Sequence, residues 1–580
     1  MDTSLYPPRY QQKLLTLLTE TVDLDANTDG VLIHSDNFQA LNLLQARYRE
    51  QVKCIYIDPP YNTGNDGFIY KDNYQHSSWL TAMENRLQVA YPLLSQDGVN
   101  FISIDDHEQA ELKILCNRIY GESDFVADFI RKTKSTTNDA KTGLNYQHEF
   151  LLCYAKNKYL INILGGQKDL ERYSNPDNDP NGAWVSTDPS KAGYAEIQYY
   201  PIVNPYTGKV DYPPKGRSWV PTKSTLQKHI NEGRICFKKE HGENERGFIY
   251  KRYLRDLKTM QKTMDSLLFT DNEYMNQAFT KAFNEIGFAG LFQNPKGISF
   301  LKRIIEHGGD SNSSVLDYFA GSGTTAHAVI NLNREDGGKR KYILVEQGEY
   351  FDTVLKPRIQ KVIYSENWKN GKPVENTSGS LNGVSQIVKV LKLESYEDTL
   401  NNIVLKGQDD FLKTLPENVR EDYLLRYLLD TESKASLLNS DDFRHPFDYR
   451  LNIATDSAGA YQSTVIDLIE TFNYLLGIQV KNITDEREKH AYVMIEGTLL
   501  NGESALIIWR DVEKMGYAEV AKLFCKQKIK PNSEQYDVIY LNGDHDMANR
   551  WQNEDNSESQ LNLRAIEPEF LNRMFAEKGE

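Results

Sequence analysis

The stretch that decides the fold reads Val52-Lys53-Cys54-Ile55-Tyr56-Ile57-Asp58-Pro59-Pro60-Tyr61. Its first six residues form a short, mostly apolar run that is typical of a buried strand, so the last four lie where that strand ends. Open α/β sheets bind their ligands just beyond the carboxyl ends of their strands. The position therefore predicts a ligand site, although a Pro-Pro turn with a surface acid explains these four residues equally well.

The chemistry of residues 58–61 suits one kind of ligand. The two prolines fix φ and remove two backbone donors, which leaves carbonyl groups to accept hydrogen bonds. Asp58 adds a carboxylate acceptor, and Tyr61 adds a flat face for stacking. Acceptors beside an aromatic ring match the exocyclic amino group of a flat heterocycle, such as the edge of adenine or cytosine.

A second motif favours the ligand-site interpretation. Residues 314–319 are expected to form another strand, residues 320–325 read Ala-Gly-Ser-Gly-Thr-Thr, and an apolar helix begins at Ala326. Small residues let the backbone approach a ligand, and a helix N-terminus favours an anion. A strand over residues 341–345 follows and ends in Glu346, an acid placed to hold ribose hydroxyls. Ala326 stands where a dinucleotide fingerprint has its third glycine, which favours a smaller adenosyl ligand over NAD.

Both motifs resemble those of a known family. Residues 58–61 are similar to the catalytic motif of amino-group DNA methyltransferases, and residues 319–323 are similar to their S-adenosylmethionine (AdoMet) motif. The catalytic motif comes first, about 250 residues ahead of the cofactor motif, as in the permuted β class. The resemblance implies an α/β fold: a Rossmann-like AdoMet-dependent methyltransferase sheet, circularly permuted with the catalytic half first, with an inserted β-rich recognition domain and a C-terminal α+β domain.

Further segments extend the resemblance over nearly the whole chain. Asn294-Pro295-Lys296 resembles the family's other cofactor motif, with Gly297 in place of the usual final proline. Residues 34–37 resemble the segment that contacts the cofactor's adenine. The segments that resemble the modification (Mod) subunit of type III restriction–modification systems are residues 391–399, 435–439, 467–477 and 508–511.

A chain of 580 residues predicts several domains. The expected boundaries are 1–29 for an N-terminal helical segment, 30–158 for the catalytic half, 159–259 for a target-recognition domain, 260–365 for the AdoMet-binding half, 366–384 for a polar linker and 385–580 for a C-terminal domain with partner or dimer contacts. Residues 131–138 are expected to form a basic loop that contacts phosphate or covers the active site, or else a solvated hairpin tip. Residues 260–286 are expected to be helical.

The resemblance implies roles for the catalytic motif. The amino nitrogen of adenine is a poor nucleophile because its lone pair is conjugated with the ring, so the Asp58 carboxylate and the Pro59 carbonyl are expected to accept its hydrogens. Pro60 completes the motif, Tyr61 stacks on a base flipped out of the duplex, and Asn62 lines the same pocket. Adenine is expected over cytosine because an aspartate at the first position usually accompanies adenine in this family.

The same resemblance implies the cofactor site. The residues expected to bind AdoMet are Asp36, Asn294, Lys296, Asp317, Phe319, Ala320, Gly321, Ser322, Gly323, Thr324 and Glu346. Among them, Asp36 would hold the adenine, Glu346 the ribose, and residues 319–324 the methionine end. A surface lysine is the alternative for Lys296. His148 and Glu149 are expected to be strand residues near the pocket rather than an acid–base pair, and no metal is expected.

Composition bounds the partners and the location. The net charge is −15, but residues 125–258 hold 22 Lys and Arg against 15 Asp and Glu, a balance of +7 that leaves −22 for the rest. Such a segment can bind phosphate because its field acts over about a Debye length, ~10 Å, although chance unevenness also explains it. No apolar run approaches the ~18 residues of a membrane helix and no signal layout is present, so a cytoplasmic protein is expected. Five scattered cysteines predict reduced buried thiols.

Several functions are compatible with these patterns. The first is a site-specific DNA adenine N6-methyltransferase, the Mod subunit of a type III system, which binds double-stranded DNA as a homodimer and pairs with a Res helicase–endonuclease subunit. The second is a solitary regulatory methyltransferase, and the third is a non-catalytic DNA-recognition subunit. An RNA or protein methyltransferase is a fourth, which the permuted order and the long insert disfavour.

Overall fold

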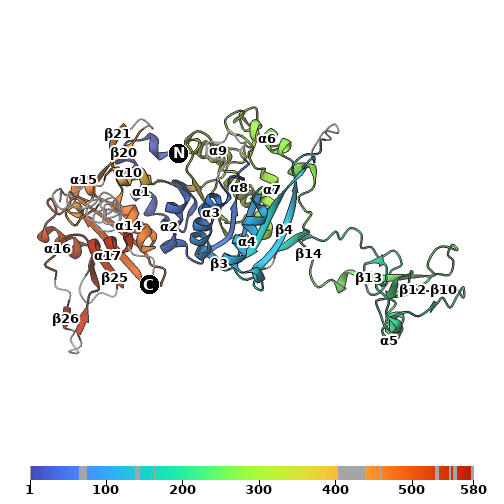
Figure 1. The fold of residues 1–580 in the computed structure, drawn as a ribbon. Coiled ribbons are helices and arrows are strands. Elements are labelled where there is room, and N and C mark those ends of the chain that lie inside the picture. Colours follow the sequence, from blue (N-terminus) through green and yellow to red (C-terminus); the bar gives the residue numbers. More distant parts are fainter. Residues whose placement is uncertain are drawn as a thin grey trace, which may run out of the picture. The chain divides into compact units, whose positions relative to one another are not determined.

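The computed structural model describes residues 2–63, 75–136, 144–161, 163–402, 438–455, 460–529, 535–547, 550–552 and 558–575. Thr137 and Asn138 of the expected basic loop, and residues 435–437 of one Mod-like segment, lie outside these ranges. The chain divides into two compact units (Figure 1). One comprises Met1–Asn162 with Asp265–Glu580, and the other is Ile163–Met264.

An eight-stranded sheet organises the larger unit. Six strands run parallel, and β5 and β4 close the sheet antiparallel to their neighbours. In sheet order the strands are β19 (Ile387–Lys392), β1 (Thr28–His34), β16 (Lys341–Glu346), β15 (Ser314–Asp317), β2 (Val52–Ile57), β3 (Leu94–Ile104), β5 (His148–Ala155) and β4 (Phe125–Lys132). β2 from the first half thus pairs with β15 from the second, with Ile55 opposite Leu316. This order confirms the predicted circularly permuted α/β sheet.

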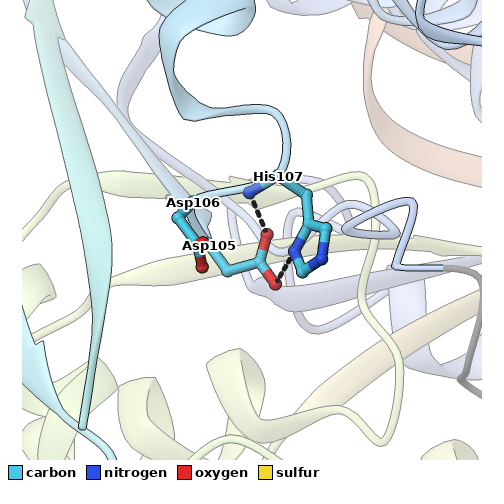
Figure 2. A group of neighbouring side chains, drawn as sticks. All are labelled: Asp105, Asp106 and His107. Carbon is cyan, nitrogen blue, oxygen red and sulfur yellow. Dashed lines mark hydrogen bonds and ion pairs between the residues drawn. The ribbon is translucent and has the colours of Figure 1, made fainter. Parts of the chain in front are cut away.

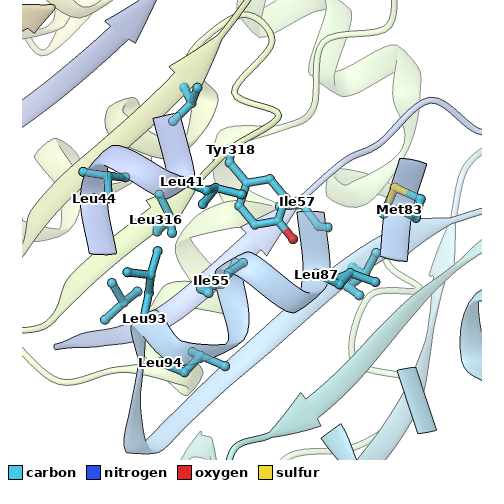
Figure 3. Packing of buried hydrophobic residues seen from close by; sticks show 14 of the residues in the cluster. Leu41, Leu44, Ile55, Ile57, Met83, Leu87, Leu93, Leu94, Leu316 and Tyr318 are labelled. Atoms are coloured by element: carbon cyan, nitrogen blue, oxygen red, sulfur yellow. The ribbon is translucent and has the colours of Figure 1, made fainter. Parts of the chain in front are cut away.

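The strand β2 shows why the sheet is covered by helices. Ile55 and Ile57 pack with Leu41, Met83 and Leu87 of the helices that follow β1 and β2 (Figure 3). Side chains along a strand alternate between its two faces, so Tyr56 points to the opposite face, where it meets the ring of Phe300 edge-on.

The helices of this part are α2 (Asn37–Tyr48), α3 (His76–Ala90), α4 (Gln109–Tyr120), α6 (Asn276–Glu285), α7 (Ile298–Gly308), α8 (Thr324–Asp336) and α9 (Lys356–Tyr364).

The smaller unit is the predicted β-rich insert. Its core consists of buried Tyr200, Ile202, Trp219, Leu226, Ile235 and Phe248. Its elements are β6 (Leu164–Gln167), β7 (Trp184–Thr187), β8 (Ser190–Ala192), β9 (Ile202–Val203), β10 (Val210–Asp211), β11 (Arg217–Trp219), α5 (Lys223–Asn231), β12 (Ile235–Phe237), β13 (Phe248–Tyr253) and β14 (Gln261–Thr263). β14 pairs with β6, so the unit ends a few residues beyond the predicted 259.

The expectation of a helix over residues 260–286 is wrong for its first half. β14 occupies residues 261–263, and α6 begins only at Asn276. The pairing of β14 with β6 is a contact between distant segments, which local periodicity does not encode. Only α6 carries apolar side chains at helical spacing, Phe279 and Phe283, and both are buried.

A second, mixed five-stranded sheet forms the C-terminal part of the larger unit. Its core contains the rings of Phe472, Trp509, Tyr540 and Phe570. The sheet consists of β22 (Gln479–Asp485), β23 (Tyr492–Thr498), β24 (Ser504–Arg510), β25 (Val538–Leu541) and β28 (Leu563–Ala565). The other elements are α10 (Tyr396–Asn401), β20 (Arg450–Ala454), β21 (Tyr461–Val465), α14 (Leu468–Leu476), α15 (Arg487–His490), α16 (Tyr517–Lys526), β26 (Arg550–Gln552), β27 (Glu558–Gln560) and α17 (Ile566–Met574).

Two of the predicted boundaries differ from the structure. Residues 366–384 contain a hairpin, β17 (Asn367–Lys369) and β18 (Lys372–Val374), joined by Asn370 and Gly371, both at positive φ. An Asn-Gly pair is a strong hairpin signal that the polar composition obscures. Residues 385–580 are not separate, because β19 is an edge strand of the main sheet and α1 (Pro8–Thr19) packs on β22.

Two further sequence expectations concern exposure and membranes. Cys54, Cys116 and Cys153 are buried free thiols, whereas Cys236 and Cys525 are exposed, so the expectation of buried thiols is wrong for these two. Within the described ranges, no helix combines the length and the apolar character needed to cross a bilayer.

Candidate active site

A cavity of about 260 Å³ lies where β2, β15 and β16 end. Its walls combine both sequence motifs, although about 260 residues separate them in the chain. Of the expected site residues, those that line it are Asp58, Pro59, Pro60, Tyr61, Asn294, Lys296, Asp317, Phe319, Ala320, Gly321, Ser322, Thr324 and Glu346. The permuted topology therefore builds one site from two distant segments.

Hydrogen bonds and an ion pair fix the positions of Asp58 and Pro60 in the catalytic motif. The Tyr61 hydroxyl donates to Asp58 Oδ1 at 2.9 Å, and Lys296 Nζ lies 3.2 Å from the same oxygen. The Trp79 indole N–H donates to the Pro60 carbonyl at 2.8 Å, which anchors the turn to α3. In the described part of the chain the Pro59 carbonyl accepts no hydrogen bond. Asp58 Oδ2 and the Pro59 carbonyl are thus the acceptors that remain for a ligand.

A buried cluster of charged side chains, Arg131, Glu149 and Lys296, contacts Tyr61 of the catalytic motif. Glu149 Oε2 accepts from Arg131 Nη2 at 2.5 Å, and it lies 3.2 Å from the Tyr61 hydroxyl and 3.3 Å from Lys296 Nζ. Arg131 also donates to the Tyr274 carbonyl at 2.9 Å. A fully buried guanidinium needs such partners, because an unpaired charge in the interior is strongly unfavourable.

The position of Arg131 corrects one prediction. Arg131 and Lys132 belong to β4 rather than to a basic loop, and the Arg131 side chain is only 2% exposed. From the sequence, Arg131 looks like part of a solvent-facing loop, because the carboxylate that pairs with it, Glu149, is 18 residues away in the chain. Glu149 lies near the pocket, as expected of a strand residue, and in fact lines it.

The cluster sets the charges of the two carboxyl groups. Burial raises the pKa of Asp58, the Lys296 ammonium opposes that rise, and the Glu149 charge adds to it. Burial also disfavours ionised Glu149, but the cations of Lys296 and Arg131 outweigh it and lower the pKa of Glu149 to about 2. Glu149 is therefore a fixed anion that neutralises Lys296, whereas Asp58 is the carboxylate available to a ligand.

The glycine-rich loop forms the opposite wall. The Gly321 N–H donates to Glu346 Oε2, and the N–H groups of Gln347 and Gly348 donate to Oε1, each at 2.8 Å. Gly321 has φ of +53°, and a Cβ there would lie 3.3 Å from the ring of Phe292, which also lines the cavity. A side chain at this position would therefore crowd Phe292 and narrow the cavity.

Asp317, at the end of β15, is another acid that lines the cavity. Its carboxylate accepts from the Phe319 N–H at 3.1 Å and from the Thr325 hydroxyl at 2.5 Å. Burial raises the pKa of Asp317 to about 7 in spite of these hydrogen bonds. The acid therefore holds the loop in place through one hydrogen bond to each of its oxygens.

Three expected residues are not among those that line the cavity. Asp36 caps α2 by accepting from the N–H groups of Phe38 and Gln39. Asn62 donates to Glu108 Oε1 at 2.6 Å. Gly323, at φ of +77°, is the N-cap residue of α8, and a Cβ there would lie 3.2 Å from Leu355. The roles of Asp36 and Asn62 toward ligands stay predictions.

The departure from the family pattern at Gly297 has a steric cause. A Cβ on Gly297 would overlap the ring of Phe279, at 1.9 Å from its nearest carbon. The preceding Lys296 points its ammonium at Asp58 and Glu149, while its carbonyl accepts from the Thr324 hydroxyl at 3.1 Å. Lys296 is therefore not a surface lysine, and it links the cofactor motif to the catalytic motif.

Asp105, Asp106 and His107 form a group at the end of β3 whose potential ligand atoms lie within 4.8 Å of one another (Figure 2). Asp105 lines the cavity, but its two oxygens are engaged at 3.0 Å by the N–H and the ring nitrogen of His107. Because these bonds lie within one turn, we assign no metal to the group.

Comparison with known proteins defines the class. The sequence model of the DNA methylase family matches residues 52–356, which is more than half of the chain, so the chain belongs to this family. The match runs from the start of β2 to the start of α9 and contains both walls of the cavity.

Individual relatives refine the comparison. The chain is 32% identical over 376 residues to the type III restriction-modification enzyme StyLTI Mod subunit of Salmonella typhimurium, covering 58% of this chain and 55% of that one. It is 31% identical over 381 residues to the EcoPI Mod subunit of Escherichia phage P1, covering 56% and 58%. It is 31% identical over 353 residues to the type II methyltransferase M.KpnI of Klebsiella pneumoniae, covering 56% and 81%. The chain thus spans somewhat more than half the length of these Mod subunits.

Proposed function

We propose that this chain transfers a methyl group from AdoMet to the N6 amino group of adenine in DNA. The observation that carries the proposal is the shared cavity of residues 58–61, the loop over 319–324 and Glu346. Three features of the cavity fit AdoMet. Gly321 has no side chain that would narrow the cavity, the N-terminus of α8 follows β15, and β16 ends in the acid Glu346.

The chemistry follows from the acceptors that are left open. AdoMet, when bound, supplies an electrophilic methyl group on its sulfonium. Asp58 Oδ1 is occupied by Tyr61 and Lys296, so Oδ2 and the Pro59 carbonyl accept the two hydrogens of the amino group. Drawing these hydrogens aside frees the nitrogen lone pair from the ring, and acceptors already aimed at the nitrogen stabilise the positive charge that develops on it. The raised pKa of Asp58 strengthens it as an acceptor.

The target base needs to leave the duplex, because stacking hides the amino group. Tyr61 is proposed to stack on the flipped base. The Lys296 ammonium lies 4.9 Å from the centre of the Tyr61 ring, and the ring also lines the cavity. An aspartate at the head of the motif supports adenine as the target.

The smaller unit is proposed to read the DNA sequence. Residues 163–264 hold 17 Lys and Arg against 12 Asp and Glu, a balance of +5 in a chain of net charge −15. Exposed tyrosines gather on this unit, with ring centres 5.3 Å apart for Tyr194 and Tyr199 and 5.8 Å apart for Tyr199 and Tyr212. Cations and aromatic side chains of this kind suit contacts with phosphates and bases.

The similarity to Mod subunits supports a role in a type III restriction–modification system. In this proposal the chain is the modification and recognition subunit, acts as a homodimer in the cytoplasm and has a Res helicase–endonuclease as its partner. The match to M.KpnI, which covers 81% of that methyltransferase, favours a second candidate: a methyltransferase that acts without such a partner.

The test is single-molecule sequencing, with modification calling, of DNA from cells that express this chain alone and have no other adenine methyltransferase. The proposal predicts N6-methyladenine at one short site, and its loss in an Asp58→Ala variant. Methylation of one strand of an asymmetric site supports the type III assignment. N4-methylcytosine would overturn the adenine assignment, and unmodified DNA with a protein that binds AdoMet would favour a non-catalytic recognition subunit.

A further inference from the structure

A buried arginine lies directly behind the glycine-rich loop. Arg358 belongs to α9 and is 1% exposed. Its Nη1 donates to the Ser322 carbonyl at 3.2 Å and to the Ser322 and Thr324 hydroxyls at 2.8 Å each. Ser322 and Thr324 both line the cavity, so two of the residues that contact the guanidinium face the ligand site.

This guanidinium has no carboxylate partner in the described part of the chain. Burial lowers the pKa of Arg358 to about 9, which still leaves it charged at neutral pH. His327, whose Nδ1 lies 3.4 Å from Arg358 Nε, is kept neutral because burial and the nearby arginines lower its pKa. An unpaired charge in the interior is costly, and the known ways to compensate it are hydrogen bonds and a counter-ion.

None of the five acids that line the cavity supplies that counter-ion. Asp58 and Glu149 contact Lys296, and Asp105 is held by His107. Asp317 is held by the Thr325 hydroxyl and the Phe319 N–H, and Glu346 is held by three backbone N–H groups. Neither carboxylate pairs with Arg358. The positive charge behind the loop is thus left for an anion that enters the cavity.

The hydroxyl groups show where that anion would bind. The Thr324 hydroxyl accepts from Arg358 and donates to the Lys296 carbonyl at 3.1 Å, so both of its roles are filled. The Ser322 hydroxyl also accepts from Arg358, but the nearest acceptor for its own hydrogen is Thr324 Oγ1 at 3.4 Å, which is a poor bond. The Ser322 O–H is therefore available to an acceptor in the cavity, beside the first turn of α8, where anions are favoured.

We propose that Arg358 positions Ser322 and Thr324 and supplies the charge by which this cavity selects the carboxylate of the cofactor's methionine end. The inference rests on the proposed function, because it takes AdoMet to be the ligand. It adds a recognition element for one group of that ligand, and it makes Arg358 a positioning residue that touches neither the methyl group nor the base.

The test compares two ligands that differ only in this carboxylate. Calorimetry of the full chain measures the affinity for AdoMet and for decarboxylated AdoMet in the wild type, Arg358→Met, Arg358→Lys and Ser322→Ala. Arg358→Met is expected to weaken AdoMet by about 10- to 100-fold, equivalent to ~1.4–2.8 kcal/mol, and decarboxylated AdoMet by less than about threefold. Arg358→Lys, which keeps the charge, is expected to keep most of the preference, and Ser322→Ala to lose several-fold of it.

Arg334→Met is the matched control, because Arg334 is a partly buried arginine that also donates to carbonyl groups, those of Asn382 and Val362, and does not contact Ser322 or Thr324. It is expected to leave the ratio of the two affinities unchanged. Equal weakening of both ligands by Arg358→Met, or an unchanged ratio, would overturn the inference. If Arg358→Met does not fold, Ser322→Ala decides, because an unchanged ratio in that variant refutes the route through the hydroxyl. A wild type that binds neither ligand would refute the proposed function itself.

Discussion

Replacing Lys296 by methionine tests the link between the cofactor motif and the catalytic motif. The substitution keeps the length of the side chain and removes the ammonium that lies 3.2 Å from Asp58 Oδ1. Because this charge opposes the effect of burial on Asp58, its loss is expected to raise the pKa of Asp58 further. The proposed methyl transfer needs the ionised carboxylate as acceptor, so activity should be lost at a higher pH on the acid side.

The size of the effect follows from the geometry. At an effective dielectric constant of about 20, two unit charges at this separation attract by roughly 5 kcal/mol. Glu149 lies 3.3 Å from the same ammonium and shares that attraction, and water that enters the site offsets more of it. The expected net change is about 1.4–2.7 kcal/mol, which is a rise of about one to two units in the pKa of Asp58.

The assay is the pH dependence of kcat/KM for transfer of a labelled methyl group to DNA. The acid limb of Lys296→Met should lie about one to two pH units above that of the wild type. Glu149→Gln should move it the other way, because the charge of Glu149 raises the pKa of Asp58. Lys302→Met, which removes a lysine paired with Glu335, is the control. Identical acid limbs in wild type and Lys296→Met would refute the proposed coupling.

Three more substitutions probe separate parts of the site. Asp58→Ala should lower methyl transfer by about 10²–10³-fold or more while AdoMet affinity by calorimetry stays within about threefold; retained activity would remove Asp58 from the mechanism. Gly321→Val places a branched side chain at φ of +53°, close to Phe292, so strain of about 1–3 kcal/mol should weaken AdoMet by ~5- to 100-fold; unchanged affinity would refute the assigned loop. Arg131→Met leaves Glu149 without its shortest partner and should lower the free energy of unfolding by about 3–5 kcal/mol in urea titrations at neutral pH. Because the pKa of Glu149 is lowered to about 2, the difference should shrink as the pH falls from about 4 toward 2, and a difference independent of pH would contradict that origin.

The fold was predictable where one strand carries its own signal. The apolar runs of β2 and β15 identify two buried strands, and the order of the motifs identifies the permutation. The short β14 and the edge strand β19 were missed because each is defined by its pairing with a segment far away in the chain. Such strands are hard to predict from the sequence, because the preference of a segment for β structure depends mainly on its tertiary neighbours.

The site was predictable where a residue type has one plausible use. Asp58 follows β2, Gly321 lies in the loop between β15 and α8, and Glu346 ends β16. All three line the cavity, as their positions at the ends of strands predict. Arg131 could not be assigned in the same way, because a cation in a strand is compatible with a surface, a loop or a buried pair until its partner is known. Asp36 has two compatible uses: its position before a helix predicts a cap, which the structure shows, and its expected contact with the cofactor's adenine stays a prediction.

The permutation has a consequence for how the site comes into being. β15 lies between β16 and β2, so neither half of the sheet contains both walls of the cavity. The first half supplies the acceptor Asp58, and the second supplies the glycine loop and the lysine that reaches back to that acceptor. The Lys296 ammonium contacts Asp58 only after β2 and β15 have paired, and before that pairing each charge is hydrated separately. The charge state that the proposed methyl transfer needs is therefore a property of the assembled sheet. The pairing of β2 with β15 lets the two motifs line one cavity, although about 260 residues separate them in the chain.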